Sequence, residues 1–138
     1  MARILVVDDD PDILETLSYA FAQEGHTVQV ESDGLAALAA ARRTPPELAV
    51  LDVMLPGLNG YEISRLLKDD MQHGRIPGFP ILMVTARRVA SPERLQFLTA
   101  WSRADATLWK PYDLGVLLCH VRAWTTPGEV ARPVEEPA

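Results

Sequence analysis

The chain has the sequence ILVVDDDP at residues 4–11, and this stretch decides how its N-terminal part folds. Four consecutive apolar residues suit a strand that is covered on both faces of a sheet. Three aspartates end the apolar run. Asp10 followed by Pro11 is a typical helix start, because the aspartate caps the first turn and proline fits its first position. The stretch therefore predicts one β–α unit, with an acidic turn between its strand and its helix.

The same order of strand and helix repeats along the rest of the chain. We predict strands at residues 4–7, 27–30, 48–51, 81–84 and 107–109, and helices at residues 12–23, 35–43, 61–71, 92–101 and 114–125. Ser91, which also precedes a proline, is expected to cap the fourth helix, and Gly25 is expected to end the first. Five β–α units in succession predict an α/β fold with a parallel sheet and helices on both faces.

The composition favours an acidic, intracellular domain. The 138 residues include 48% hydrophobic ones and carry a formal charge of −6. Such a domain has no electrostatic footprint for nucleic acid or an anionic membrane, so any DNA contact is expected from another domain. The apolar run at residues 4–7 is too short for a signal peptide or a membrane span. The single cysteine, Cys119, fits a reducing compartment and is expected in the core, and we predict a cytoplasmic location.

The last residues of the chain differ in composition from the rest. Residues 127–138 contain three prolines and three glutamates and have too little apolar content to pack. We therefore assign residues 1–125 to one domain and residues 126–138 to a flexible tail or the stub of a linker. The breaker-rich stretch at residues 73–80 is expected to form a loop.

Polar residues follow four of the predicted strands. Asp8 and Asp9 come after the first, Asp52 after the third, Thr85 after the fourth and Lys110 after the fifth. Ligands bind beyond the carboxyl ends of the strands in a doubly wound sheet. Two carboxylates about 4 Å apart repel by roughly 4 kcal/mol at an effective dielectric near 20, so a cation or a proton is needed between them. An all-oxygen site of this kind suits Mg²⁺, with the lysine and the hydroxyl available to phosphate oxygens.

Four short motifs occur in order in the sequence: VVDDDP at residues 6–11, LDVMLPG at residues 51–57, VTAR at residues 84–87 and WKPY at residues 109–112. Together they resemble the receiver domains of response regulators over roughly residues 3–125, most of all the receivers of winged-helix transcription regulators. The resemblance implies a flavodoxin-like, doubly wound (βα)5 three-layer sandwich with sheet order 2-1-3-4-5. It also implies a switch in two-component signal transduction that is not an enzyme in the ordinary sense.

The resemblance implies a role for each matching residue. Asp52 matches the aspartate that accepts a phosphoryl group from a sensor histidine kinase. The expected Mg²⁺ ligands are Asp9, Asp52, the Met54 backbone carbonyl and, through water, Asp8. Thr85 matches the switch hydroxyl and Lys110 the lysine that pairs with the phosphoryl group, and the Lys110–Pro111 bond is expected to be cis. Homodimerisation through the fourth helix, fifth strand and fifth helix is also implied, with Arg103, Asp105 and Arg122 as candidate contacts.

The chain departs from the family at the fifth strand. The position three residues before Lys110 is usually aromatic, and here it is Thr107; the usual Gly-Ala pair before the strand is Arg103-Ala104. The coupling between the switch hydroxyl and an aromatic ring is therefore absent or replaced. We hypothesise that Trp101 or Trp109 takes that part.

Two other functions compete with this interpretation. Residues 8–10 superficially offer the Asp-x-Asp motif of phosphatases that form an aspartyl-phosphate, but Asp12 stands where Thr or Val normally follows, and the chain has no room for a cap domain. A receiver-shaped scaffold that is never phosphorylated is the other alternative. The acidic run taken alone could also be a solvated strand end with a helix cap, but a calcium loop fails, because Ile13 stands where glycine is required.

Overall fold

The computed structural model describes residues 2–86 and 91–125 of the chain. Five parallel strands form one sheet in the order β2-β1-β3-β4-β5, which confirms the predicted topology. The strands are β1 (Arg3–Val7), β2 (Thr27–Glu31), β3 (Leu48–Asp52), β4 (Ile81–Ala86) and β5 (Ala106–Lys110). Each of the last three ends one or two residues later than predicted, so that Asp52, Thr85 and Lys110 belong to the strand ends themselves.

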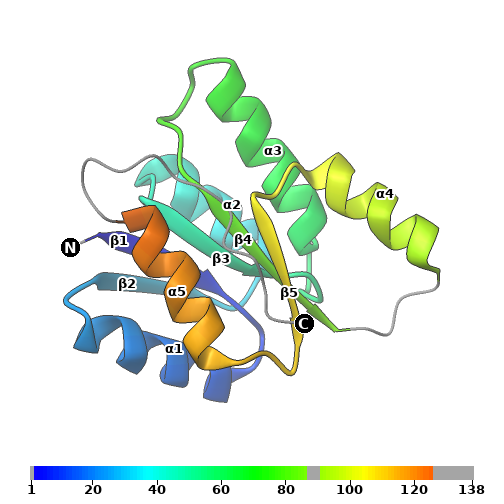
Figure 1. Ribbon diagram of the computed structural model, residues 1–138. Helices are drawn as coiled ribbons and strands as arrows, with labels where there is room; N and C mark the ends of the chain where they lie inside the picture. Colours follow the sequence, from blue (N-terminus) through cyan, green and yellow to red (C-terminus); the bar gives the residue numbers. More distant parts are fainter. Residues whose placement is uncertain (1, 87–90, 126–138) are drawn as a thin grey trace.

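The helices connect the strands and cover both faces of the sheet (Figure 1). They are α1 (Pro11–Gln23), α2 (Gly34–Arg43), α3 (Gly60–Gln72), α4 (Pro92–Ser102) and α5 (Leu114–Thr125). The predicted caps are present: the Asp10 side chain accepts from the Asp12 N–H, and the Ser91 side chain accepts from the Arg94 N–H. Gly25 follows the C-cap of α1 at a φ of 87°, a conformation that favours glycine.

Two apolar clusters form the core, one on each face of the sheet. Alternate side chains of a strand point to opposite faces. Leu5, Leu51 and Met83 therefore pack on one face with α2 and α3, whereas Val6, Val50 and Val84 pack on the other with α1 and α5. The central strand β3 is buried along its whole length, as its unbroken apolar sequence predicts.

The prediction for Cys119 is wrong, and two other predicted features lie outside the described residues. Cys119 is exposed on α5 and is not a core residue, because Leu117, His120, Val121 and Trp124 form the buried stripe of that helix. The tail assigned to residues 126–138, and Arg87 of the VTAR motif, lie outside the described residues. Within those residues, no helix is both long and apolar enough to cross a membrane.

Candidate metal centre

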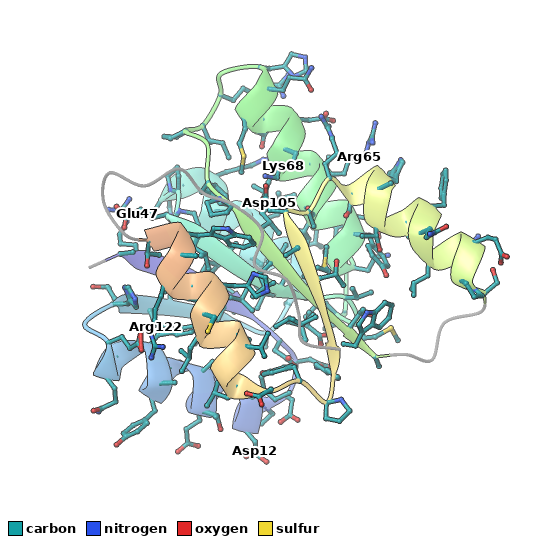
Figure 2. All side chains as sticks on the ribbon, in the orientation of Figure 1. Asp12, Glu47, Arg65, Lys68, Asp105 and Arg122 are labelled. Carbon is teal, nitrogen blue, oxygen red and sulfur yellow. The ribbon has the colours of Figure 1, made fainter. Side chains whose placement is uncertain are left out.

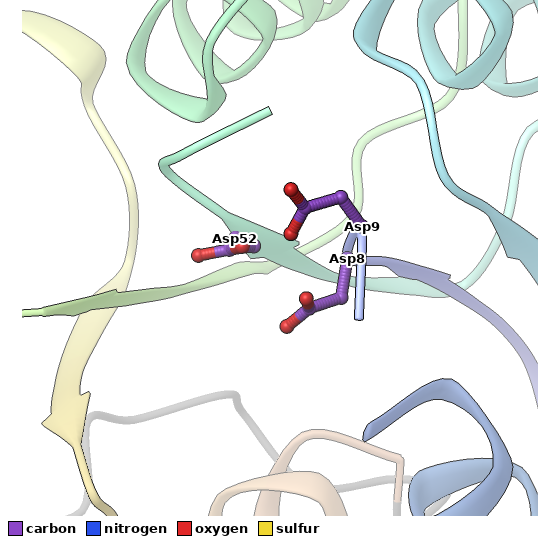
Figure 3. Close-up of side chains that lie close together, drawn as sticks. All are labelled: Asp8, Asp9 and Asp52. Atoms are coloured by element: carbon purple, nitrogen blue, oxygen red, sulfur yellow. The ribbon is translucent and has the colours of Figure 1, made fainter. Parts of the chain in front are cut away.

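Three carboxylates meet at the carboxyl edge of the sheet. Asp8, Asp9 and Asp52 each offer one oxygen, and these oxygens all lie within 4.8 Å of one another. Figure 3 shows the side chains of Asp8 and Asp9, which follow β1, close to that of Asp52 at the end of β3. Asp8 and Asp52 are each only 3% exposed, whereas Asp9 is exposed. The predicted convergence of the three aspartates is therefore present.

The sheet topology explains why these residues meet. β1 and β3 are neighbours, and Val7 lies opposite Leu51, which places the residues that follow them side by side. The Asp8 side chain is further fixed by accepting from the Asp10 N–H at 2.9 Å. The acidic turn is thus shaped by the strand pairing on one side and by the start of α1 on the other.

Lys110 supplies a positive charge to the same edge. Its Nζ lies 3.1 Å from Asp8 Oδ2 and 3.4 Å from Asp52 Oδ1. The lysine comes from β5, which is separated from β3 by β4. The Lys110–Pro111 peptide bond is cis, as predicted. Four residues from three distant parts of the sequence therefore form one charged cluster, which we call the acidic site (Asp8, Asp9, Asp52 and Lys110).

Within the acidic site, the negative charge of Asp52 is only partly compensated. Burial, and next the negative charge of Asp8, raise the pKa of Asp52 to about 6, although Lys110 and the Met54 backbone N–H, which hydrogen bonds to Asp52, act in the opposite direction. Burial alone would lower the pKa of Lys110, but its hydrogen bond to Asp8 and the charges of both aspartates raise it overall. The lysine is therefore a fixed positive charge at neutral pH.

The donor set fits a small divalent cation. When all four side chains are ionised, three carboxylates and one ammonium group leave a net charge of −2 on a partly buried site. A divalent cation neutralises that charge, and Mg²⁺ binds to a few carboxylates while it retains several waters. The exposure of Asp9 leaves the site open to solvent, as a partly hydrated ion requires.

Thr85 and Met54, the other two expected site residues, lie around this site. Thr85 is 1% exposed and its hydroxyl donates to the Ala86 carbonyl at 3.4 Å. It follows Val84, the register partner of Asp52, so its side chain starts on the opposite face of the sheet from Asp52. The Met54 side chain is 67% exposed, and the part of its backbone carbonyl in metal binding stays a prediction.

The sequence predicts no role for two residues that lie near the acidic site, Gly60 and Tyr112. Gly60 is the first residue of α3, and a Cβ atom there would lie 2.4 Å from the Asp52 carbonyl oxygen, so a side chain at position 60 would displace the strand end. Tyr112 is half-buried; burial, and next the charge of Asp8, raise the pKa of its phenol, which places it within electrostatic reach of the site. In the sequence, Gly60 could have been recognised as a glycine at the start of a predicted helix, and Tyr112 as the last residue of the WKPY motif.

The family comparison agrees with this geometry. The family described as the response regulator receiver domain matches residues 4–122 of the chain. The chain belongs to this family. As a receiver domain it is a component of two-component signal transduction, and the phosphoacceptor function of the family is consistent with an acidic site at this edge of the sheet.

Curated relatives of the receiver domain include DNA-binding response regulators and transcriptional regulatory proteins. It is 39% identical over 136 residues to the DNA-binding response regulator MtrA of Mycolicibacterium smegmatis, an alignment that covers 99% of this chain and 54% of that protein. It is 38% identical over 120 residues to the probable transcriptional regulatory protein TcrX of Mycobacterium tuberculosis, covering 87% of this chain and 48% of that protein. The chain thus spans about half the length of these relatives, which are regulators and not conventional enzymes.

A solved structure supports the fold assignment. The chemotaxis response regulator CheY4 of Vibrio cholerae is 28% identical to the receiver domain and superimposes with a TM-score of 0.75, over 90% of this chain and 98% of that one. The receiver domain therefore has the expected flavodoxin-like architecture.

Proposed function

We propose that Asp52 accepts a phosphoryl group from the phosphohistidine of a sensor histidine kinase, in a reaction that depends on Mg²⁺. The observation that supports this proposal is the convergence of Asp8, Asp9 and Asp52 within 4.8 Å, with Lys110 Nζ 3.4 Å from Asp52. One buried carboxylate beside a fixed ammonium group and two further acids is an arrangement suited to phosphoryl transfer.

In the proposed reaction, an Asp52 carboxylate oxygen attacks phosphorus. The new O–P bond forms as the N–P bond to the imidazole breaks, and that electron pair remains on the imidazole nitrogen. Lys110 holds its charge beside the attacking oxygen and orients the transferred group, and the Thr85 hydroxyl donates to one phosphoryl oxygen. Asp8, Asp9, Asp52 and the Met54 carbonyl would hold Mg²⁺, which supplies positive charge that offsets the repulsion between the acids and the incoming phosphate.

A second part of the proposal concerns the protein to which this domain belongs. Because the chain spans about half of its DNA-binding relatives, we propose that residues 1–125 are the regulatory domain of a longer response regulator and that residues 126–138 begin a linker. The formal charge of −6 supports placing any DNA contact outside this domain. Homodimerisation on α4, β5 and α5 is proposed as the output. The candidate contacts already form ion pairs within the chain: Arg103 with Asp69, Asp105 with Lys68, and Arg122 with Glu24. Figure 2 labels Lys68, Asp105 and Arg122.

The test is intact-mass measurement after incubation with acetyl phosphate. With Mg²⁺ we expect a gain of one phosphoryl group, about 80 Da, which is lost when EDTA replaces the metal and in the Asp52→Asn variant. Asp12→Asn is a matched control, because Asp12 is exposed on α1 and only its backbone N–H takes part in the cap. No mass gain would favour a scaffold that is never phosphorylated. Continuous release of phosphate from a general phosphomonoester would favour a phosphatase.

A further inference from the structure

A cavity of about 640 Å³ separates α4 from β5. Leu95, Gln96 and Thr99 line it on the helix side, and Thr107 and Trp109 line it on the strand side. Figure 1 shows α4 beside α3, with its first residues pointing away from the sheet. A cavity of this size is within the range of small-molecule sites and easily admits an indole ring.

The C-terminal end of α4 is fastened to α3. The Arg103 guanidinium donates to Asp69 and Gln72, and the Arg65 guanidinium lies 4.9 Å from the centre of the Trp101 ring while it donates to the Trp101 carbonyl at 2.8 Å. We call these contacts the α3–α4 clamp. Ser102, at the clamped end, is buried, whereas Phe97, at the middle of α4, is 64% exposed. The N-terminal half of α4 therefore has room to approach β5 while its other end stays in place.

Trp109 lies directly beside Thr85. The two residues are register partners on adjacent parallel strands, and Met83 and Thr107 are the preceding pair on the same face. Register partners point to the same face of a sheet, so the indole is the lateral neighbour of the Thr85 side chain. The small Thr107 fills little of the space next to them, and its buried Oγ1 lacks a hydrogen-bond partner among the described residues.

We propose that Trp109 is the residue that reports the position of Thr85 to α4. This inference rests on the proposed function, because the hydroxyl of Thr85 moves only if a phosphoryl group is present on Asp52. Its bond to Ala86 is long, at 3.4 Å, and a charge-assisted bond to a phosphoryl oxygen is stronger. The moving side chain vacates space beside the indole, Trp109 turns into that space, and the first turns of α4 close on β5.

The structure selects Trp109 over the other tryptophans. Trp101 is held in the α3–α4 clamp and packs against the core cluster beneath α3. Trp124 is 9% exposed and packs on α5 with its ring centre 5.2 Å from that of His120, on the opposite face of the sheet. Trp109 thus combines contact with the cavity and a place beside the switch hydroxyl.

The test uses tryptophan fluorescence together with intact mass. The W101F/W124F double variant keeps Trp109 as its single tryptophan. With Mg²⁺ and acetyl phosphate, we expect its emission to shift to shorter wavelength and its quenching by acrylamide to fall, in proportion to the phosphorylated fraction. If that variant does not fold, the difference between the native chain and W109F, each with and without acetyl phosphate, gives the same signal.

Variants at position 85 separate this inference from the proposed function. At equal phosphorylated fraction by mass, Thr85→Ala should lose the Trp109 signal and Thr85→Ser, which keeps the hydroxyl, should retain it. A phosphorylated chain with unchanged Trp109 emission, or a signal that survives in Thr85→Ala, overturns the inference and leaves the phosphorylation of Asp52 intact. Absence of any mass gain in the native chain overturns the proposed function, and the inference with it.

Discussion

The Nζ atom of Lys110 lies 3.4 Å from Asp52 Oδ1 and is within hydrogen-bonding distance of Asp8 as well. One ammonium group therefore serves two buried carboxylates. Burial, and next the charge of Asp8, raise the pKa of Asp52 to about 6, and a single ammonium group does not offset both effects. The carboxylate is mostly ionised at neutral pH, but at a cost in free energy that a bound cation would relieve.

Replacing Lys110 with methionine should raise the pKa of Asp52 further, because the ammonium group is one of the factors that lower it. We expect phosphorylation by acetyl phosphate to slow by roughly 10²-fold, the usual effect of removing one stabilising group from a reacting centre. Carboxyl titration by NMR and the rate of mass gain measure the two effects. Lys68→Met is the matched control, since Lys68 pairs with Asp105 away from the acidic site, and an equal slowing there would contradict the prediction.

Asp52→Asn should stabilise the metal-free protein at pH 7.5. The folded-state pKa of Asp52 is raised, so the folded state binds more protons than the unfolded state between about pH 4 and pH 6. The ionisation penalty therefore grows as the pH rises through that window and stays constant above it. We expect a gain of roughly 1 to 2 kcal/mol at pH 7.5 after allowance for solvent screening, shrinking towards pH 4.

Urea unfolding in EDTA at several pH values measures this difference. Excess Mg²⁺ should reverse the order of stability, because it stabilises the native chain by binding to the folded state alone. A variant that is less stable than the native chain in EDTA at pH 7.5 would contradict the raised pKa.

Gly60→Ala should destabilise the domain and disturb the acidic site together. The added Cβ would lie 2.4 Å from the Asp52 carbonyl oxygen and 2.9 Å from Val53 Cα, which are backbone atoms that cannot turn aside. Overpacking of this kind costs about 1 to 3 kcal/mol. Gly78→Ala is the control, because its Cβ would meet nothing within 4 Å. Thermal unfolding with and without Mg²⁺ should show a lower Tm and a smaller Mg²⁺ shift for Gly60→Ala only.

Two substitutions at Arg103 should differ in stability. Arg103 has a φ of 59°, a left-handed conformation that costs a residue with a side chain about 1 kcal/mol. Both Arg103→Ala and Arg103→Gly lose the bonds to Asp69 and Gln72, but only glycine relieves the backbone cost. The glycine variant should be the more stable of the two by about 1 kcal/mol in urea unfolding. Equal stabilities would mean that the conformation relaxes in the alanine variant.

The sequence was sufficient to predict the sheet and the meeting of the acids. Unbroken apolar runs such as residues 48–51 require a sheet covered on both faces, and parallel strands bring the residues after them to one edge. The caps at Asp10 and Ser91 were equally predictable, because a capping side chain followed by proline is typical of a helix start.

Other features depend on tertiary contacts that no local pattern encodes. The prediction that Cys119 lies in the core is wrong. The helix α5 is apolar on most of its surface, and only its packing against the sheet determines that the stripe with Leu117 and Val121 is buried. The cavity beside Thr107 depends on where α4 lies, which is set by the α3–α4 clamp. The close approach of Gly60 to the Asp52 carbonyl depends on how α3 begins over the end of β3.

The alternation of side chains along the strands has a consequence for how this protein can diversify. Asp8, Asp52 and Lys110 continue the rows that face α1 and α5, whereas Thr107 and Trp109 line the cavity under α4 on the other side. Substitutions under α4 can therefore alter that surface without changing the side chains of the acidic site.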